Sequence, residues 1–167
     1  CIRDSSFTWF EKPSVISIQK SEALLKDLGA LDSKGIITPM GLKMRLLPLH
    51  PRLSRMLLDA VDLGCCEMVS FFCALIQERD FFLSTTDKKM ERSRQDIYGS
   101  SDSDFMARFL VFLAVKSRNF DVSYCNFLGV HRNTCVQIKR IQEQILSIVR
   151  IKEFRDAESD EDLFIQC

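Results

Sequence analysis

Hydrophobic residues in the first part of the chain recur at the spacing of one helix face, at Ile18, Leu24, Leu25 and Leu28. This pattern predicts a helix over residues 15–28. Ser14 precedes the helix as a candidate N-cap, and Gly29 follows it where a left-handed residue would end a helix. The chain is therefore expected to open with an amphipathic helix bounded by its own cap residues.

A turn and a second helix are expected directly afterwards. Residues 32–35, Asp-Ser-Lys-Gly, can reverse the chain between two short β-prone pieces and so predict a small β-hairpin. Thr38 can cap the next helix, and Pro39 is preset for a first helical turn. Two helices and a hairpin over residues 1–47 make a small winged-helix-like unit. It has too few apolar residues to be stable without a packing partner.

The rest of the chain alternates apolar helical segments with turn residues. Helices are expected over residues 51–63, 65–83, 104–117, 122–128 and 134–153. Ser103 is a candidate cap for the helix that follows it, and Thr134 with Gln137 matches a capping box at the start of the last helix. Residues 84–103 are polar and lack apolar periodicity, which predicts a long mobile loop that could contain one exposed helical turn.

The fold class expected from these segments is mainly α. A degenerate winged-helix unit over residues 1–47 should pack on a helical bundle over residues 48–155, and residues 156–167 form an acidic tail. Apart from the hairpin, no segment alternates with the period of a β-strand.

One stretch of the sequence carries an unusually specific pattern. Residues 25–41 read LxxLGALDxxGxITPxG, and residues 47–58 read LPLHPRLSRMLL. Together they resemble the region that follows the two motor domains of DEAH-box ATP-dependent RNA helicases, especially the HrpB-like branch. The resemblance extends upstream to the aromatic residues 7–10 and downstream to Tyr124-Cys125 and residues 141–145.

The resemblance implies a degenerate winged-helix domain that continues into a helical ratchet domain. In that family the region packs on the motor domains and lines the RNA channel, so the implied partners are the chain's own motor domains and RNA. ATP and Mg²⁺ would bind in the motor domains. This chain has no GxxxxGK[ST] loop, which an ATPase uses to hold phosphates with backbone amides. The chain itself is therefore expected not to be an enzyme, and its parent is expected to be an ATP-dependent helicase, a hydrolase.

The composition is that of a folded chain, with 46% hydrophobic residues and 13 phenylalanines among 167 residues. No apolar run approaches the roughly 18 residues that would cross a bilayer, and no secretory signal opens the sequence. Because the first residue is Cys rather than Met, we expect an excised fragment of a longer protein. The expected location is cytoplasmic. The seven cysteines include no CxxC pair, so buried reduced thiols are expected and a metal site is not.

Charge is balanced overall but unevenly distributed. Five acidic residues lie beyond Arg155, which leaves residues 1–155 with 23 basic and 18 acidic side chains, a net charge of +5. Three cations lie away from the apolar seam of the last helix: Arg132, Lys139 and Arg140. They are the candidate nucleic-acid contacts, because they could face a phosphate backbone or stack on bases. An ordinary solvated pairing of Lys139 with Glu143 is the alternative.

A second basic pair, Arg52 and Arg55, lies at a predicted helix start. Cations are unfavourably placed there unless an acidic partner is near. We expect these two arginines to contact the winged-helix unit or an absent motor domain. His50 and His131 lie at turns, where a structural role is the ordinary one.

Two other functions stay open on the sequence alone. A helical protein-interaction module unrelated to nucleic acid would present an apolar surface to a partner protein. A winged-helix DNA-binding regulator would need a basic recognition helix, and residues 39–47 offer only Lys43 and Arg45. RNA binding should weaken steeply with salt, whereas apolar docking should respond little.

Overall fold

The computed structural model describes residues 13–84, 87–100 and 103–150. Within them the chain is mainly helical, as predicted. The helices are α1 Val15–Asp27, α2 Pro39–Leu46, α3 Pro51–Asp62, α4 Cys66–Gln77, α5 Lys88–Tyr98, α6 Asp104–Ser117, α7 Val122–Phe127 and α8 Arg132–Arg150. Two features of the sequence analysis, the aromatic residues 7–10 and the acidic tail at 156–167, lie outside the described residues.

Three helix starts follow from local cap chemistry. Ser14, Thr38 and Ser103 each accept a hydrogen bond from an amide in the first turn of α1, α2 and α6. Such amides have no partner inside their own helix, so a side-chain acceptor stabilises the helix at that position. The predicted caps are confirmed at all three.

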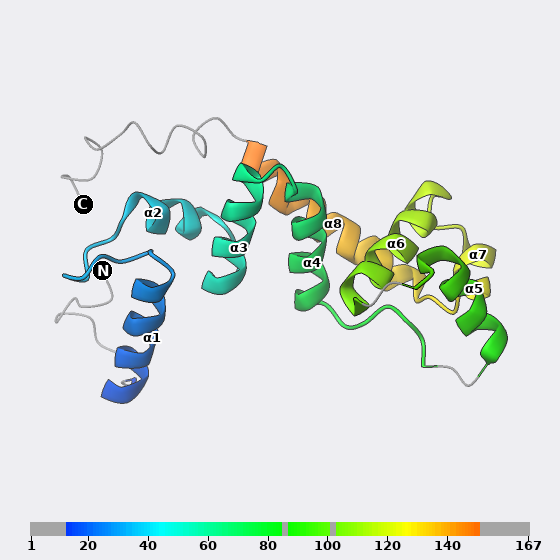
Figure 1. Cartoon of the computed structure of the whole chain (residues 1–167), viewed down its shortest axis with the longest axis horizontal. Helices are drawn as coiled ribbons and strands as arrows, with labels where there is room; N and C mark the ends of the chain where they lie inside the picture. The colour runs from blue at the N-terminus through cyan, green and yellow to red at the C-terminus, as the bar shows by residue number, and fades with distance from the viewer. Residues whose placement is uncertain (1–12, 85–86, 101–102, 151–167) are drawn as a thin grey trace.

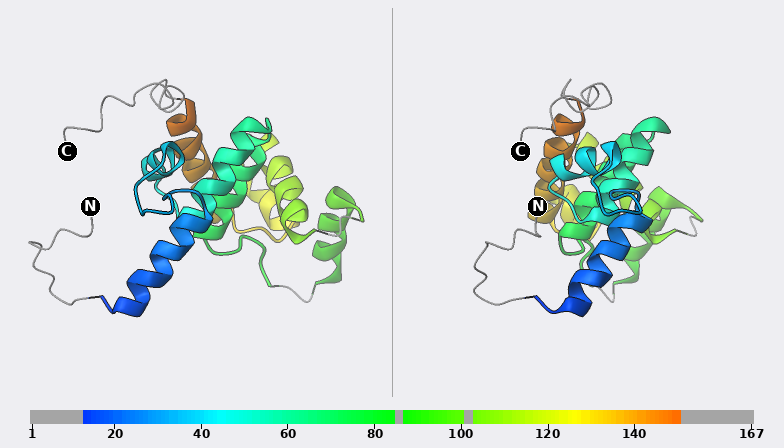
Figure 2. Two further views of the ribbon diagram at one scale, coloured as in Figure 1. Left: turned by 60° about the vertical axis from the view of Figure 1, so that its left-hand side comes forward. Right: turned by 90° about the vertical axis from the view of Figure 1, so that its left-hand side faces the viewer.

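The helices form an elongated body (Figure 1). α1 and α2 lie at one end, α3 and α4 in the middle, and α5, α6 and α7 at the other end, while α8 passes behind α4. α1 extends away from the body in two further views (Figure 2), and none of its residues is buried.

Two buried clusters hold the body together. In the first, the ring centroids of Phe71 on α4 and Phe112 on α6 lie 4.7 Å apart, and both side chains have no exposed surface. In the second, Leu57 on α3 packs with Ile145 on α8 and with Met44 on α2. The second cluster therefore joins the winged-helix unit to the helical bundle, as the small size of that unit requires.

The predicted β-hairpin is wrong for the described residues, which contain no strand pair there. Leu31 and Ile37 form a single antiparallel bridge. The Asp32 carboxylate accepts hydrogen bonds from the amides of Lys34, at 2.9 Å, and Ile36, at 2.8 Å, and so closes the turn. Because α2 begins two residues after Ile37, the segment after the turn is too short to form a second β-strand.

The predicted mobile loop over residues 84–103 is also wrong, because α5 occupies its centre. The Asp87 carboxylate caps this helix by accepting from the Lys89 amide at 2.8 Å. Arg94 is buried, and its guanidinium lies 4.6 Å from the centroid of the Phe82 ring. α5 is thus held by this cation–π contact together with Ile97 and Tyr98, which pack on the first cluster, and these apolar positions are too few for periodicity to predict the helix.

Two helix ends differ from the sequence expectation. α4 ends at Gln77, and the segment after it is extended, with Phe82 bridged to Val130. α8 begins at Arg132, so Thr134 lies inside the helix and its amide donates to His131 Nδ1 at 3.3 Å. The predicted capping box of Thr134 with Gln137 is therefore wrong, since a histidine takes the acceptor role.

Candidate functional site

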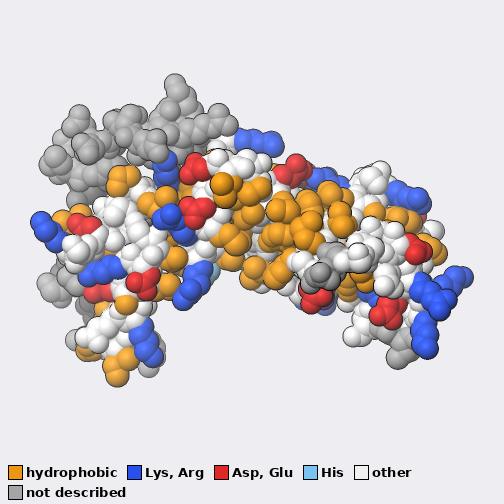
Figure 3. All heavy atoms as spheres, viewed as in Figure 1, with side chains coloured by type: hydrophobic (Ala, Val, Ile, Leu, Met, Phe, Trp, Pro, Cys, Tyr) orange, Lys and Arg blue, Asp and Glu red, His pale blue; other side chains and the backbone are white. Residues whose placement is uncertain are grey.

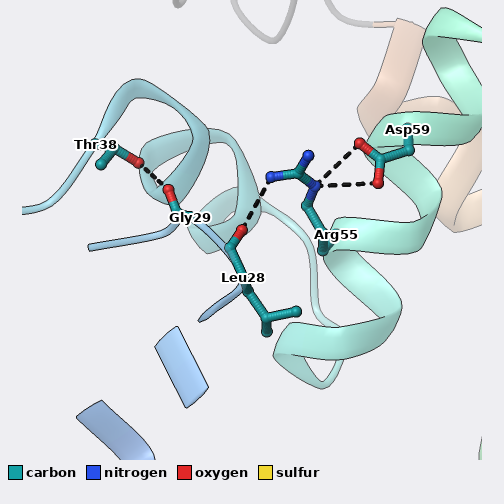
Figure 4. Close-up of polar contacts among 5 residues, drawn as sticks. All are labelled: Leu28, Gly29, Thr38, Arg55 and Asp59. Carbon is teal, nitrogen blue, oxygen red and sulfur yellow. Dashed lines mark hydrogen bonds and ion pairs between the residues drawn. The ribbon is translucent and has the colours of Figure 1, made fainter. Parts of the chain in front are cut away.

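Arg55 joins the end of α1 to α3 (Figure 4). Its Nη1 donates to the Leu28 carbonyl at 2.9 Å, and its Nε donates to both carboxylate oxygens of Asp59, at 3.0 and 3.1 Å. The Leu28 carbonyl belongs to the last turn of α1, where helix carbonyls lack an internal partner. Asp59, four residues along α3, supplies the acidic partner that a cation near a helix start needs.

The turn that Arg55 contacts is held from the other side by Thr38. The Thr38 hydroxyl donates to the Gly29 carbonyl (Figure 4) and also accepts from the Gly41 amide. Gly29 has φ +72°, a conformation that glycine adopts without strain, and a Cβ there would lie 3.2 Å from Arg55 Nη1. The segment between α1 and α2 is therefore fixed by two polar side chains from neighbouring elements.

Gly41 is a residue whose role the sequence analysis missed. A Cβ at this position would lie 2.2 Å from the Ala30 carbonyl oxygen, so only glycine allows α2 to approach that backbone. The feature of the sequence that indicated this role was the glycine itself, because an isolated glycine within a helical pattern can mark a place where another part of the chain packs closely against the helix.

Replacing Arg55 with lysine is expected to lower the free energy of unfolding by about 1 kcal/mol. The single ammonium of lysine cannot donate to the Leu28 carbonyl and to both oxygens of Asp59 at once. The Arg55 side chain is half-buried, so water replaces the lost hydrogen bonds only in part. Chemical denaturation of the purified variant measures this change. Arg52→Lys is the matched control, because Arg52 is exposed and its change should stay within about 0.5 kcal/mol. Equal effects in the two variants would show that the junction does not depend on the guanidinium.

The three candidate RNA contacts lie on α8 in different surroundings. Arg132 donates from Nε to the Phe120 carbonyl at 2.8 Å, and Lys139 lies 3.5 Å from a Glu143 carboxylate oxygen. Arg140 is exposed, and no ion pair involves it within the described parts of the chain. Arg132 is exposed and Lys139 is half-buried, and each also makes a contact within the fold, whereas Arg140 makes no ion pair with the described residues.

The buried cysteines and the two histidines of the described residues have structural surroundings. Burial raises the pKa of Cys73 to about 11 and that of Cys135 to about 12, so both thiols stay protonated and unreactive at neutral pH. No group of three or more metal-ligand side chains comes together in the described residues. His50 and His131 each accept a backbone hydrogen bond at a helix start.

No described helix is both long enough and apolar enough to span a membrane. The five cysteines in the described parts of the chain are free thiols. Cys73, Cys125 and Cys135 are buried, and Cys65 and Cys66 are partly exposed.

Comparison with known proteins gives two adjacent family matches. Residues 21–49 match the helicase associated domain (HA2), winged-helix, and residues 50–110 match the helicase associated domain (HA2), ratchet-like. The two matches meet between Leu49 and His50, at the start of α3, so the Leu28–Arg55 hydrogen bond connects one matched domain to the other.

Several curated relatives carry the same region. The chain is 27% identical over 145 residues to the pre-mRNA-splicing factor ATP-dependent RNA helicase prp22 of Schizosaccharomyces pombe, covering 86% of this chain and 12% of the relative. It is 24% identical over 165 residues to the probable ATP-dependent RNA helicase DHX35 of Homo sapiens, covering 96% and 24%. It is 35% identical over 86 residues to the probable ATP-dependent RNA helicase DHR2 of Saccharomyces cerevisiae, covering 52% and 12%. The chain thus spans a quarter or less of each relative.

Proposed function

Because residues 21–110 belong to the helicase-associated (HA2) winged-helix and ratchet-like domains of DEAH-box ATP-dependent RNA helicases, we propose that this chain is the C-terminal accessory region of such a helicase. In this proposal the chain packs on the motor domains and lines the RNA channel. ATP and Mg²⁺ act in the motor domains, and the chain contributes no ATPase chemistry. The observation that carries the proposal is the unbroken order of the two matches in a chain covering 10% to 24% of helicase relatives.

Packing on motor domains is supported by the apolar surface of the chain. Hydrophobic side chains gather over the middle of one face, around α4 (Figure 3). On α4 itself, Ile76 is 51% exposed. A continuous apolar area of this kind is typical of a surface that another domain covers. The Arg55 junction supports the same proposal, because it lets the winged-helix and ratchet units dock as one body.

RNA contact is supported by the cations along α8. Lys139 is half-buried beside Glu143, and Arg140 is exposed one residue further along the helix. Cations in such positions can bind phosphates without a change of fold. The narrower assignment to the HrpB-like branch, the domain boundaries at residues 47 and 155, and the cytoplasmic location stay predictions.

Salt-dependent RNA binding tests the RNA part of the proposal. The purified chain is titrated with a fluorescently labelled single-stranded RNA at several salt concentrations. The double variant Lys139→Gln, Arg140→Gln should bind RNA more weakly. Its plot of log K against log salt should also be less steep by about 1.4, since each single-strand phosphate contact contributes about 0.7 to the steepness. Lys88→Gln with Lys89→Gln on α5 is the control, with unchanged binding expected.

A protein-interaction module is the second candidate function, and the exposed apolar area around α4 favours it. In that case the chain would not bind RNA at low salt. Its association with a partner protein would change little with salt, because apolar docking releases few counterions. RNA binding that the Lys139 and Arg140 variant leaves unchanged would instead place the RNA contact on another surface.

A further inference from the structure

The turn between α6 and α7 has an unusual backbone. Asn119 and Phe120 adopt φ values of 51° and 56°, the left-handed region that bulky residues rarely occupy. Such a conformation persists only where the surroundings determine it. Here the Phe120 side chain is buried, its amide donates to the Val115 carbonyl at 3.0 Å, and its carbonyl accepts from Arg132. The turn is thus fixed firmly between α6 and α8.

Aromatic rings and cations surround this turn. The Arg118 guanidinium lies 3.9 Å from the centroid of the Tyr124 ring. The Tyr124 and Phe127 rings lie 6.3 Å apart at an interplanar angle of 20°, which is a stacked arrangement. Phe127 is 51% exposed, whereas Tyr124 is half-buried. The stack therefore ends on a phenyl ring that meets solvent.

The same corner carries net positive charge. Lys139 lies 6.0 Å from the centroid of the Phe120 ring, and Arg132 is bonded to the carbonyl of the same residue. The two acidic side chains nearby already have partners. The Asp121 carboxylate accepts a hydrogen bond from the Tyr124 amide at 2.8 Å, and Glu143 forms an ion pair with Lys139. Arg118 thus lies on the Tyr124 ring, and Arg132 and Lys139 lie at the Phe120 turn that precedes α7, so three cations accompany two carboxylates at this corner.

We propose that Tyr124 and Phe127 form a stacking platform for an unpaired RNA base, with Arg118, Arg132 and Lys139 binding the adjacent phosphates. This inference rests on the proposed function, since it adds a base-contacting surface to the cations of α8. Every base has a π-face, so stacking on a fixed aromatic ring binds single strands with little sequence preference. The rigid turn supports the platform, because a ring that is already placed loses little entropy on binding.

The test compares Phe127→Leu with the intact chain. The probe is a single-stranded RNA carrying one 2-aminopurine, whose fluorescence falls when the base stacks. The intact chain should quench the probe. Phe127→Leu should remove the quenching and weaken binding about 10-fold, within the range of aromatic stacking on one base. Its salt slope should be unchanged, because no phosphate contact is lost.

Two further variants complete the test. Phe105→Leu is the matched control, since Phe105 is 46% exposed on α6 away from the platform, and its binding and quenching should equal those of the intact chain. Phe127→Trp should retain both binding and quenching, which separates loss of the ring from loss of the fold. If the intact chain does not bind RNA, the proposed function fails. If Phe127→Leu binds and quenches like the intact chain, the platform is refuted while the proposed function stands.

Discussion

Replacing Phe71 with alanine is expected to lower the free energy of unfolding by about 3 to 5 kcal/mol. Phe71 has no exposed surface, and its ring lies 4.7 Å from that of Phe112 and 5.3 Å from that of Phe109. The variant loses the transfer free energy of the ring and leaves a cavity between α4 and α6, which close-packed neighbours fill only in part. Urea denaturation followed by circular dichroism measures the change.

Phe72→Ala is the matched comparison for Phe71→Ala. Phe72 follows Phe71 on α4, but its side chain is only half-buried. Its loss should therefore be clearly smaller, about 1 to 2 kcal/mol. Equal losses, or a loss below about 1 kcal/mol for Phe71→Ala, would show that the centre of the core lies elsewhere.

Replacing Gly41 with alanine is expected to destabilise the fold by about 1 to 3 kcal/mol or more. The sign is informative, because alanine in a helix interior is normally more stable than glycine by about 1 kcal/mol. Here the new Cβ would meet the Ala30 carbonyl oxygen at 2.2 Å and Ile37 Cγ1 at 2.9 Å. α2 must move away from the turn that follows α1, which weakens the winged-helix unit.

Thermal and chemical denaturation of Gly41→Ala give this sign directly. Gly35→Ala is the control, since Gly35 has φ +82° with open space around it and should lose about 1 kcal/mol through backbone strain alone. A stabilised Gly41→Ala variant would contradict the close approach of α2 to Ala30.

Local chemistry explains which elements could be predicted from the sequence. Ser14, Thr38 and Ser103 precede their helices by one residue, so each cap acts through neighbours in the chain. The mainly α fold follows from the same short-range periodicity. These features need no knowledge of the tertiary structure.

The features that the sequence did not predict depend on distant contacts. α5 is held by Arg94 stacked on Phe82, and the extended segment after α4 is held by the bridge between Phe82 and Val130. An apolar pair such as Phe81 and Phe82 fits a buried helix and a buried strand equally well, so its partner decides the conformation. The hairpin prediction was wrong for a local reason, because α2 begins too soon after Ile37 for a second strand to form.

The candidate site also combines features that local sequence predicts with features that depend on distant contacts. The Arg55 to Asp59 spacing is visible in the sequence as a helical i,i+4 pair, but the Leu28 carbonyl that Arg55 also binds lies in the preceding unit. The sequence indicated the cations of α8 and did not indicate that Arg118, Tyr124 and Phe127 come together. The positions of Tyr124 and Phe127 in the sequence indicate a site only when the turn at Phe120, which brings α7 against α8, is known.

Photo-crosslinking with RNA tests the central claim most directly. The purified chain is irradiated in the presence of a single-stranded RNA containing 4-thiouridine, and the crosslinked peptides are identified by mass spectrometry. The proposed accessory role predicts crosslinks within residues 118–140, which decrease as salt is raised. Absence of crosslinks at low salt, or crosslinks confined to α1 through α5, would contradict it.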